Sequence, residues 1–410
     1  MAKIGIDFGT TISKVSYVDA NGEARAITFR RTVGIPTLVY YDERGKMEPK
    51  VGEEAFNRYK FADRNPDIIN WIAKDLKRNL SDTGYPTLNP NITYVDAVSD
   101  FLRYIKDYVE RQVFNQEEIT DVCITYPVMF DMNKKDLLRT AAEKAGFGNI
   151  VMLKESEAAA MGYVNYLQKR ENYIFRDSNV LIFDFGGGTL DLSLVEMKFQ
   201  GDFLLSVPPC GDPNCGGENI DREIYNAWDK YCLDRYGHHV GNEEGCIDFK
   251  LLKVDCKGNK ETLSDHFNDD SVDTPCLVDA IGGGEMLEMD VSREQWEAFL
   301  AQTLEKARRQ VREMKRRAEE KKIGIDSAVL IGGSSYIYQV RKMLREELGI
   351  EPSYIETQDV AVANGAALYI ENGIMPIRCF CMYCGHEMNS SIKYCPHCGR
   401  PNASYDIRCE

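Results

Sequence analysis

The chain has 410 residues, of which 43% are hydrophobic, and its formal net charge is −15 at pH 7. This composition is ordinary for a globular protein of about two to three domains, and the acidic balance argues against nucleic acid or an anionic membrane surface as the main partner. No apolar segment approaches the ~20 residues of a membrane-spanning helix, and a strand at residues 4–7 begins too early for a signal peptide. We therefore expect a cytoplasmic protein in a reducing compartment.

Hydrophobic periodicity places strands and helices along most of the chain. Strands are predicted at 3–7, 14–18, 38–41, 122–126, 151–154, 180–184, 190–196 and 328–331. Helices are predicted over 53–79, 95–113, 134–145, 155–167, 219–236, 292–322, 337–348 and 361–370. Ser292 and Gln295 fit a capping box at the start of the longest helix. Residues 237–290, with scattered Gly, Asp and Asn, are expected to form a small α+β subdomain.

The strongest local signal is a glycine-rich turn between two strands, VLIFDFGGGTLDLSLVE at 180–196. Glycines let backbone N–H groups approach one point because no Cβ blocks them, and such a nest of amides suits a phosphate. Asp184 ends the first strand, where its carboxylate can hold a cation through water. The chain opens with a weaker copy of this device, IGIDFGTT at 4–11. Two such hairpins predict two related lobes that grip one nucleotide between them.

Residues 377–402 have a different composition, and five of the thirteen cysteines fall within twenty residues there. Two C-x-x-C-G knuckles predict a structural zinc ribbon, because four thiolates bind zinc tetrahedrally and the metal replaces the core that so short a piece cannot build. The predicted ligands are Cys381, Cys384, Cys395 and Cys398. Cys379 and His397 are expected to be bystanders. We rank protein docking ahead of nucleic-acid binding for this ribbon, because its flanking charge is only mildly basic.

Two other clusters have simpler structural interpretations. Cys210 and Cys215 are loop thiols without further partners at metal-ligand spacing, so we expect them to be inert. The arginines at 308, 309, 312, 316 and 317 are interleaved with glutamates. Such a pattern is more typical of a solvated helix face than of a nucleic-acid surface.

The motifs, taken in order, resemble the nucleotide-binding domain of the seventy-kilodalton heat-shock (DnaK-like) chaperones, a branch of the actin-fold ATPases. IGIDFGTT and VLIFDFGGGTLDLSLVE resemble their two phosphate loops, and VLIGGSS resembles their adenosine loop. ITYPVMF, ESEAAAMGY and GGENID are similar to their hinge strand, connecting helix and a further nucleotide-contacting turn. The resemblance implies an α/β, two-lobed actin-like ATPase fold of duplicated ribonuclease-H-like lobes. Lobe I would be 1–172 completed by 360–376, lobe II 173–359, and the zinc ribbon 377–402.

The resemblance also implies a role for each matching position. Asp7 and Asp184 would hold the magnesium shell, Lys74 would orient the attacking water, and Glu155 and Asp191 would place water and cations. The phosphates would be contacted by Gly9, Thr10, Thr11, Gly186, Gly187, Gly188 and Thr189, and the adenosine side would be lined by Gly216, Gly217, Glu218, Lys260, Ser264, Gly332, Gly333, Ser334, Tyr336 and Asp359. Phosphoryl transfer needs positioning and charge neutralisation more than covalent chemistry, which agrees with these residue types.

The chain departs from the family pattern at several positions. Tyr336 stands where the adenosine loop carries an arginine that stacks on adenine, and Glu261 stands where another arginine is expected. Lys135 replaces the arginine that the family pairs with a hinge proline, here Pro127. We also expect that neither a peptide-binding β-sandwich nor its acidic-hydrophobic linker follows.

From the resemblance we expect a magnesium-dependent ATPase switch without the usual peptide-binding domain. Its cofactors would be ATP or ADP, Mg²⁺ and Zn²⁺, and its partner a protein docked by the ribbon or by the surface of a lobe. The alternatives are a nucleotide-binding scaffold that does not hydrolyse ATP and a filament-forming actin-like protein.

Overall fold

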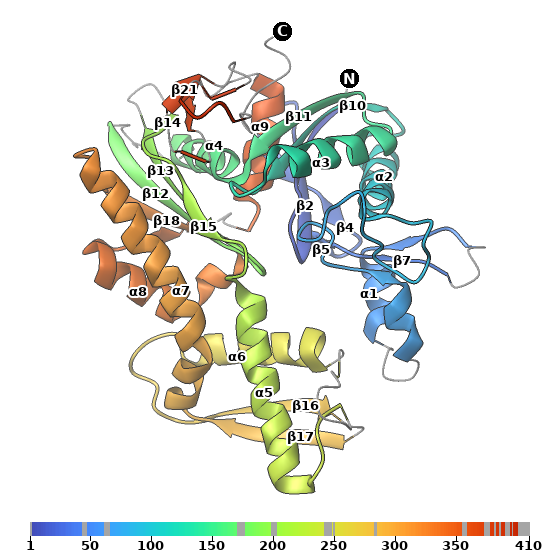
Figure 1. Ribbon diagram of the computed structural model, residues 1–410, viewed down its shortest axis with the longest axis vertical. Coiled ribbons are helices and arrows are strands. Elements are labelled where there is room, and N and C mark those ends of the chain that lie inside the picture. Colours follow the sequence, from blue (N-terminus) through green and yellow to red (C-terminus); the bar gives the residue numbers. More distant parts are fainter. Residues whose placement is uncertain are drawn as a thin grey trace.

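The computed structural model describes residues 2–42, 47–60, 66–169, 177–197, 203–241, 248, 251–282, 285–354 and 359–372, with the short stretches 378–380, 383–384, 387–389, 394–395 and 397–400. Two six-stranded sheets dominate it, and an arm of helices and short strands extends from each (Figure 1). No helix among these residues combines the length and the apolar character that a membrane crossing requires.

The first sheet is built around the hairpin of β1 and β2, which contains the first glycine turn. Its members are β11 (Asn149–Lys154), β10 (Ile119–Tyr126), β1 (Ala2–Asp7), β2 (Ile12–Val18), β3 (Ala24–Ala26) and, paired with β2, β6 (Ile35–Pro36). β1, β10 and β11 run parallel, whereas β2 and β3 are antiparallel to their neighbours. Helices α2 (Tyr94–Gln112) and α3 (Met132–Lys144) contribute to the core beneath this sheet.

The second sheet repeats this arrangement around the second glycine turn. Its members are β14 (Phe203–Leu205), β13 (Leu190–Met197), β12 (Ser178–Phe185), β18 (Ser327–Ile331), β19 (Ser353–Tyr354) and, paired with β13, β15 (Cys210–Asp212). β12 and β13 form the antiparallel hairpin, and β18 and β19 lie parallel to β12. In each sheet, five strands are paired one after another across the sheet. When these five are numbered by their order in the chain, they lie side by side in the order 3-2-1-4-5 in both sheets. The two lobes therefore share one topology, as the paired hairpins predict.

Two helices join the sheets, α4 (Glu155–Gln168) and α9 (Ala361–Asn372). One core cluster contains side chains from both helices, from β10 and β11 of the first sheet and from β12, β13 and β18 of the second. The helices touch through their backbones, because a Cβ built on Gly365 would lie 1.7 Å from the carbonyl oxygen of Ala158, and one on Gly162 would lie 2.3 Å from that of Ala361. This crossing sets how the two sheets sit relative to each other.

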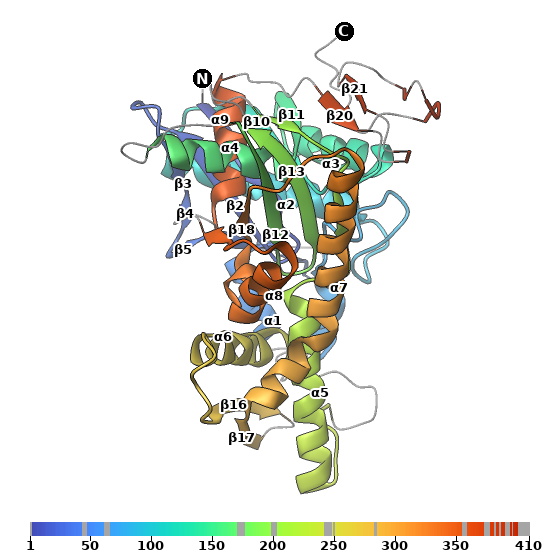
Figure 2. The same cartoon turned by 90° about the vertical axis from the view of Figure 1, so that its left-hand side faces the viewer.

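The remaining elements form the outer arms or lie beside the second sheet (Figures 1 and 2). In lobe I these are β4 (Thr28–Phe29), β5 (Thr32–Val33), β7 (Val39–Tyr40), β8 (Lys50–Val51), α1 (Glu53–Lys60), a 3₁₀ turn (Pro66–Trp71) and β9 (Ile72–Ala73). In lobe II they are α5 (Gly217–Tyr236), a π-turn (Leu251–Asp255), α6 (Cys256–His266), β16 (Cys276–Gly282), β17 (Glu285–Val291), α7 (Arg293–Glu320), a 3₁₀ turn (Gly333–Tyr336) and α8 (Tyr338–Leu348). A further hairpin, β20 (Arg378–Phe380) and β21 (Glu387–Asn389), follows α9 and lies against β14.

Most predicted elements are confirmed to within a few residues, including the capping box of Ser292 and Gln295 at the start of α7. The small α+β subdomain is confirmed in its described part by α6, β16 and β17. The arginine-rich face of α7 forms ion pairs rather than an open basic surface: Arg308 and Arg312 pair with Glu347 of α8, each at 2.8 Å.

The prediction of a mostly helical 53–79 is wrong. Helix α1 ends at Lys60, and Ile72–Ala73 forms a buried strand that pairs with β7. Pairing with a strand distant in sequence overrides the local helical pattern here, since propensity is a weak prior against tertiary contacts. Asp75 then adopts φ 53°, a left-handed conformation that turns the chain sharply between Lys74 and Lys77.

Candidate functional site

A cleft of about 660 Å³ lies between the lobes, and both glycine turns line it. The turns abut: a Cβ on Gly187 would lie 2.6 Å from Thr11 Oγ1, and one on Gly188 would lie 3.0 Å from the Thr10 side chain. The backbone N–H groups of Thr10, Thr11, Gly187 and Gly188 donate to no protein acceptor within the described part of the chain. Two turns from opposite lobes thus present unused donors at one place, as an anion site requires.

Charged side chains gather at the floor of this cleft. Asp7 ends β1 and Asp184 is the next-to-last residue of β12, and Asp191 lies opposite Asp184 in the β12–β13 register. Glu155 begins α4, and its Oε1 lies 2.5 Å from Lys77 Nζ, with both side chains at most 5% exposed. Four carboxylates therefore surround one buried ammonium group. This excess of negative charge is suited to an added cation with oxygen ligands.

The pKa values of these carboxyl groups are raised, chiefly because their enclosure disfavours the charged form. Desolvation and the charges of Asp7 and Asp191 raise the pKa of Asp184 to about 7. Desolvation, only partly offset by Lys77, raises the pKa of Asp191 to about 6 and that of Glu155 to about 8. Burial alone would lower the pKa of Lys77, but Glu155 and Asp7 outweigh it and raise that pKa. Lys77 therefore stays charged while the carboxylates compete for protons or a metal.

This electrostatic arrangement predicts how stability depends on pH. Between about pH 4 and pH 8 the folded protein holds protons on these carboxyls that the unfolded chain has released, so stability should fall as pH rises through that window. Melting curves of metal-free protein should show this fall, and millimolar MgCl₂ should remove most of it. Asp184→Asn should flatten the metal-free profile. A wild-type profile that rises with pH, or that matches Asp184→Asn, would contradict the assignment.

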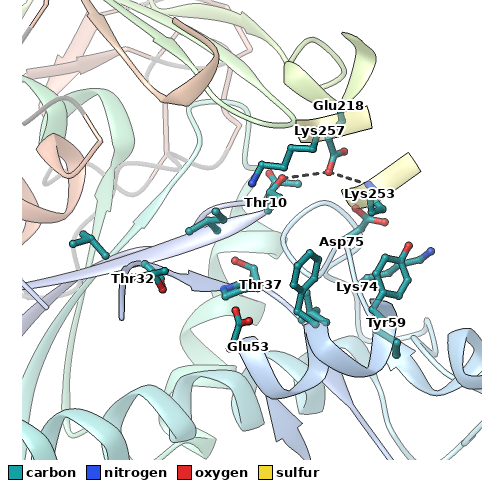
Figure 3. Close-up of a pocket in the computed structure, with 18 residues that line it drawn as sticks. Thr10, Thr32, Thr37, Glu53, Tyr59, Lys74, Asp75, Glu218, Lys253 and Lys257 are labelled. Carbon is teal, nitrogen blue, oxygen red and sulfur yellow. Dashed lines mark hydrogen bonds and ion pairs between the residues drawn. The ribbon is translucent and has the colours of Figure 1, made fainter. Parts of the chain in front are cut away.

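Lys74, the lysine expected in this site, lies elsewhere. Its ammonium nitrogen is 5.6 Å from the centre of the Tyr59 ring, and it lines a neighbouring apolar pocket of about 240 Å³ instead of the cleft (Figure 3). The left-handed turn at Asp75 separates the two lysines, so that Lys77 reaches the cleft floor and Lys74 does not. Sequence reasoning missed Lys77 because a continuous helix over 53–79 gives no ground for choosing between them.

The wall on the lobe II side is built by the start of α5 and the turn after β18. A Cβ on Gly216 would lie 2.6 Å from the backbone of Gly187, so this position needs glycine for the close approach. Ser334 donates from its hydroxyl to the carbonyl of Gly186 at 2.8 Å. Lys260 forms an ion pair with Asp221 at 2.8 Å and donates to the Gly217 carbonyl at 3.2 Å.

The cleft lining brings together nearly all of the expected residues. It contains Asp7, Gly9, Thr10, Thr11, Glu155, Asp184, Gly186, Gly187, Gly188, Thr189, Glu218, Lys260, Ser264, Gly332, Gly333, Ser334, Tyr336 and Asp359. Asp191 lies buried just behind it, and Gly216 and Gly217 pack against its walls. The lining also includes residues that sequence reasoning did not select, among them Lys14, Asp221, Asp265 and Asn268.

Glu218 connects the two lobes across this cleft. Its carboxylate accepts from Thr11 of lobe I and from Lys253 of lobe II, each at 3.2 Å (Figure 3), and lies 3.5 Å from Arg78 of lobe I. Arg78 also donates to the carbonyl of Gly188 at 3.3 Å. These attractions outweigh the effect of burial and lower the pKa of Glu218, so it is ionised at neutral pH. A ligand bound at the glycine turns would therefore lie beside Glu218 and its interlobe contacts.

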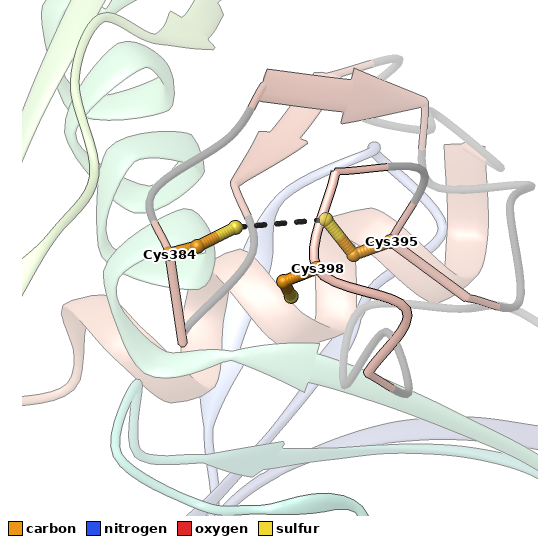
Figure 4. Close-up of side chains that lie close together, drawn as sticks. All are labelled: Cys384, Cys395 and Cys398. Atoms are coloured by element: carbon orange, nitrogen blue, oxygen red, sulfur yellow. Dashed lines mark hydrogen bonds between the residues drawn. The ribbon is translucent and has the colours of Figure 1, made fainter.

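Three of the predicted zinc-ligand cysteines lie together near the C-terminus (Figure 4). The sulfur atoms of Cys384, Cys395 and Cys398 are all within 4.8 Å of one another. Burial would raise the pKa of Cys395, but backbone N–H groups of Cys398 and His397 outweigh it and bring that pKa to about 7. Cys381, the fourth predicted ligand, lies outside the described residues.

Duplicated lobes of this topology, with a cleft between paired glycine turns, define the two-lobed actin-like ATPase fold. The family model described as Hsp70 protein matches residues 89–375, and the chain belongs to the Hsp70 family. It is 27% identical over 373 residues to a chaperone protein DnaK of Mycoplasmopsis pulmonis, and 25% identical over 394 residues to one of Prochlorococcus marinus. These matches cover 91% of this chain but only 58% and 59% of the relatives, so the chain spans less than three fifths of their length.

Proposed function

We propose that the interlobe cleft binds ATP or ADP together with magnesium and hydrolyses ATP, and that the bound nucleotide controls the relative position of the lobes. The observation that carries this proposal is the pair of abutting glycine turns above four carboxylates and one buried lysine. The similarity to chaperone proteins named DnaK supports the same class of function and chaperone-type protein partners.

The donor set fits magnesium. Asp7 and Asp184 offer carboxylate oxygens at the cleft floor, and hard oxygen ligands that act directly or through water are those Mg²⁺ prefers. Asp7 and Asp184 would hold the ion, which would supply positive charge to neutralise the phosphates. Burial and, after it, the charges of Asp7 and Asp191 raise the pKa of Asp184, so negative charge at this position is only partly compensated by Lys77 and Lys14.

The remaining floor residues can position water and accept its proton. Glu155 holds Lys77 in place, and a fixed ammonium group polarises a water molecule or a phosphate oxygen. Asp191 has a buried Oδ1 without a hydrogen-bond partner among the described residues, and its pKa of about 6 leaves it ionised at pH 7. A carboxylate with a pKa near the working pH is suited to accept a proton. Unused N–H groups of both turns would bind the phosphate oxygens.

Hydrolysis by this cleft predicts a specific loss on substitution. Asp184→Asn keeps the shape of the side chain but removes its charge, so magnesium-dependent phosphate release should fall by about 10²-fold or more, the scale seen when one group that stabilises transition-state charge is removed. Asp290→Asn, an exposed position on β17, is the matched control and should retain the wild-type rate. Calorimetry separates the alternatives: binding of ATP without phosphate release supports a scaffold, and no binding at all overturns the proposal.

We further propose that the C-terminal cysteines hold a structural zinc ion and that the ribbon docks a protein partner. The sulfur cluster supports this, since three sulfur atoms within 4.8 Å of one another fit the thiolate ligands of a zinc site and Cys381 precedes Cys384 at knuckle spacing. Elemental analysis should give about one zinc per chain. Cys395→Ser should lower this ratio, whereas Cys276→Ser in lobe II should not. Zinc-free protein with an ordered C-terminus would contradict the assignment.

A further inference from the structure

The apolar pocket that contains Lys74 has no role in the proposed hydrolysis. Its volume is about 240 Å³. A cavity of about 150 Å³ with apolar walls is large enough to bind benzene, so this pocket has room for an aromatic ring with a short chain. Apolar side chains make up most of its wall, namely Ile12, Val33, Leu38, Phe56, Tyr59 and Ile72.

One side of this pocket is formed by two aromatic rings of α1. Phe56 and Tyr59 are three residues apart on the helix, and their ring centroids lie 6.5 Å apart. Tyr59 is 4% exposed, so packing holds its ring in place, whereas Phe56 is only half-buried. The Lys74 ammonium lies 5.6 Å from the Tyr59 ring centre (Figure 3). This side of the pocket therefore combines an apolar surface with one positive charge.

A second, polar cavity of about 260 Å³ adjoins the apolar pocket. Lys74, Asp75, Glu218 and Lys253 line both cavities, so the two meet at these residues. The polar cavity is also lined by Arg78 of lobe I and by residues of lobe II, among them Asn214, Asn219, Asp221 and Arg222. Side chains from both lobes thus surround the junction of the two cavities.

The acidic groups of the polar cavity that lie in lobe II already have basic partners. Glu218 accepts a hydrogen bond from Lys253 at 3.2 Å. Asp221 forms an ion pair with Lys260 at 2.8 Å. Arg222, in contrast, is exposed and forms no ion pair with any residue that the structure describes. Its guanidinium group is therefore able to bind an anion in this cavity.

Lys74 is the charged group at the junction of the two cavities. Desolvation is the main cause that lowers its pKa, and the nearby charges of Lys253 and Arg222 lower it further. Asp75 and Glu218 raise the pKa, but they do not cancel these effects. An anion at the junction would reduce the repulsion among the three cations and replace the solvation that Lys74 has lost.

We propose that the two cavities form one binding site for a small amphipathic carboxylate, whose ring or chain enters the apolar pocket and whose charged group lies beside Lys74 and Arg222. The site borders the first glycine turn through Thr10 and Thr11. Its aromatic side and Lys74, however, are not part of the cleft lining. A bound ligand would contact Phe56 of lobe I and Arg222 of lobe II, and so would connect the two lobes.

The test is a ligand-observed NMR titration of the full chain at pH 7 with phenylbutyrate, whose ring and carboxylate match the two cavities. Its dissociation constant should be about 1 mM or below, which is modest for a ligand of this size. Phenylbutanol has the same apolar body without the charge and should bind at least about fivefold more weakly. Equal affinities for the acid and the alcohol, or no binding of the acid, would overturn the proposal.

ADP in MgCl₂ distinguishes this site from the interlobe cleft. Phenylbutyrate should still bind when ADP is saturating, because the aromatic side of the pocket and Lys74 lie outside the cleft lining. Displacement of phenylbutyrate by ADP would place the probe in the cleft and would overturn the proposal. If ADP itself does not bind, the proposed function of the cleft fails, while binding of phenylbutyrate would still establish the second site.

Variants at the charged end test which residues bind the carboxylate. Lys74→Met keeps the length of the side chain but removes its charge, so phenylbutyrate should bind at least about fivefold more weakly and phenylbutanol should be unaffected. Lys230→Met, at an exposed position of α5 that lines neither cavity, is the matched control and should change neither affinity. Arg222→Gln should weaken the acid by about twofold or more, the scale of an exposed ion pair. Unchanged preference for the acid in Lys74→Met would refute the site.

A variant of the aromatic side tests the other end. Phe56→Ala removes apolar contact area and should weaken phenylbutyrate and phenylbutanol by a similar factor of about five or more. A melting curve confirms that this variant is folded, and the Lys74→Met comparison tests the site independently if it is not. A folded Phe56→Ala protein that binds both compounds as tightly as wild type would show that the ring does not enter this pocket.

Discussion

Lys77→Met should reduce ATP hydrolysis by about 10²-fold or more, whereas Lys74→Met should leave the rate within about twofold of wild type. Lys77 is the buried ammonium group beside Glu155 at the cleft floor, and Lys74 lies against the Tyr59 ring in a different pocket. The two positions are three residues apart and carry the same change of side chain. Phosphate release at saturating ATP, measured at pH 7, compares them directly.

An effect of Lys77→Met on hydrolysis must be distinguished from an effect on folding. Breaking a buried ion pair costs about 3–5 kcal/mol when the remaining charge has no partner. The pKa of Glu155 is already about 8, and loss of Lys77 removes a charge that lowers it, so the carboxyl can become neutral by binding a proton. Lys77→Met with Glu155→Gln removes both charges and keeps the site uncharged. A folded double variant that still hydrolyses ATP at the wild-type rate would refute the role of Lys77.

Gly365→Ala should destabilise the protein by about 3 kcal/mol or more, at the upper end of the cost of overpacking. A Cβ at this position would lie 1.7 Å from the carbonyl oxygen of Ala158 and 2.6 Å from its carbonyl carbon. Both clashing atoms belong to the backbone of α4, so no side-chain rotation can relieve the overlap and the two helices must separate. Denaturant titration at 25 °C measures the effect.

Gly258→Ala is the matched control for Gly365→Ala. Gly258 lies in α6, a Cβ added to it would meet no atom within 4 Å, and its backbone is not left-handed. Alanine there should be neutral or should stabilise the protein by about 0.5–1 kcal/mol, because glycine loses more entropy on entering a helix. If Gly365→Ala is as stable as Gly258→Ala, the close α4–α9 crossing is wrong. Because that crossing connects the sheets, Gly365→Ala protein that still folds should also lose hydrolytic activity.

The glycine turns and the sheet hairpins could be predicted from local pattern. The strands around Gly186–Gly188 are short runs of apolar residues, and Asp184 at the end of the first strand follows from the same stretch. Long amphipathic helices such as α2 and α7 could also be predicted, because their apolar residues recur at three- and four-residue steps. Their N-caps are Thr93 and Ser292, residue types that are common at this position. These features depend on residues that are close together in the chain, so the sequence alone is sufficient to predict them.

The lysine of the cleft floor could not be chosen in this way. The distinction between Lys74 and Lys77 depends on a two-residue strand, Ile72–Ala73, that pairs with β7, and on the left-handed turn at Asp75. Neither has a strong local signal, since the strand is too short for periodicity and positive φ is uncommon even for aspartate. The exposed acceptors Asp265 and Asn268 were missed for a similar reason. Their place in the cleft lining depends on how α6 packs within lobe II.

By itself the sequence determined the α/β class, the two phosphate-type turns and the cysteine knuckles, because each is encoded in short runs of residues, and the repetition of the turn predicted the duplicated lobes. Only the tertiary structure decided which lysine joins Glu155, how the two turns meet, and which other side chains line the cleft. Those features arise where segments distant in the chain come within a few ångströms of one another. The free energy that selects such contacts is a sum over packing and burial that no single stretch of sequence contains.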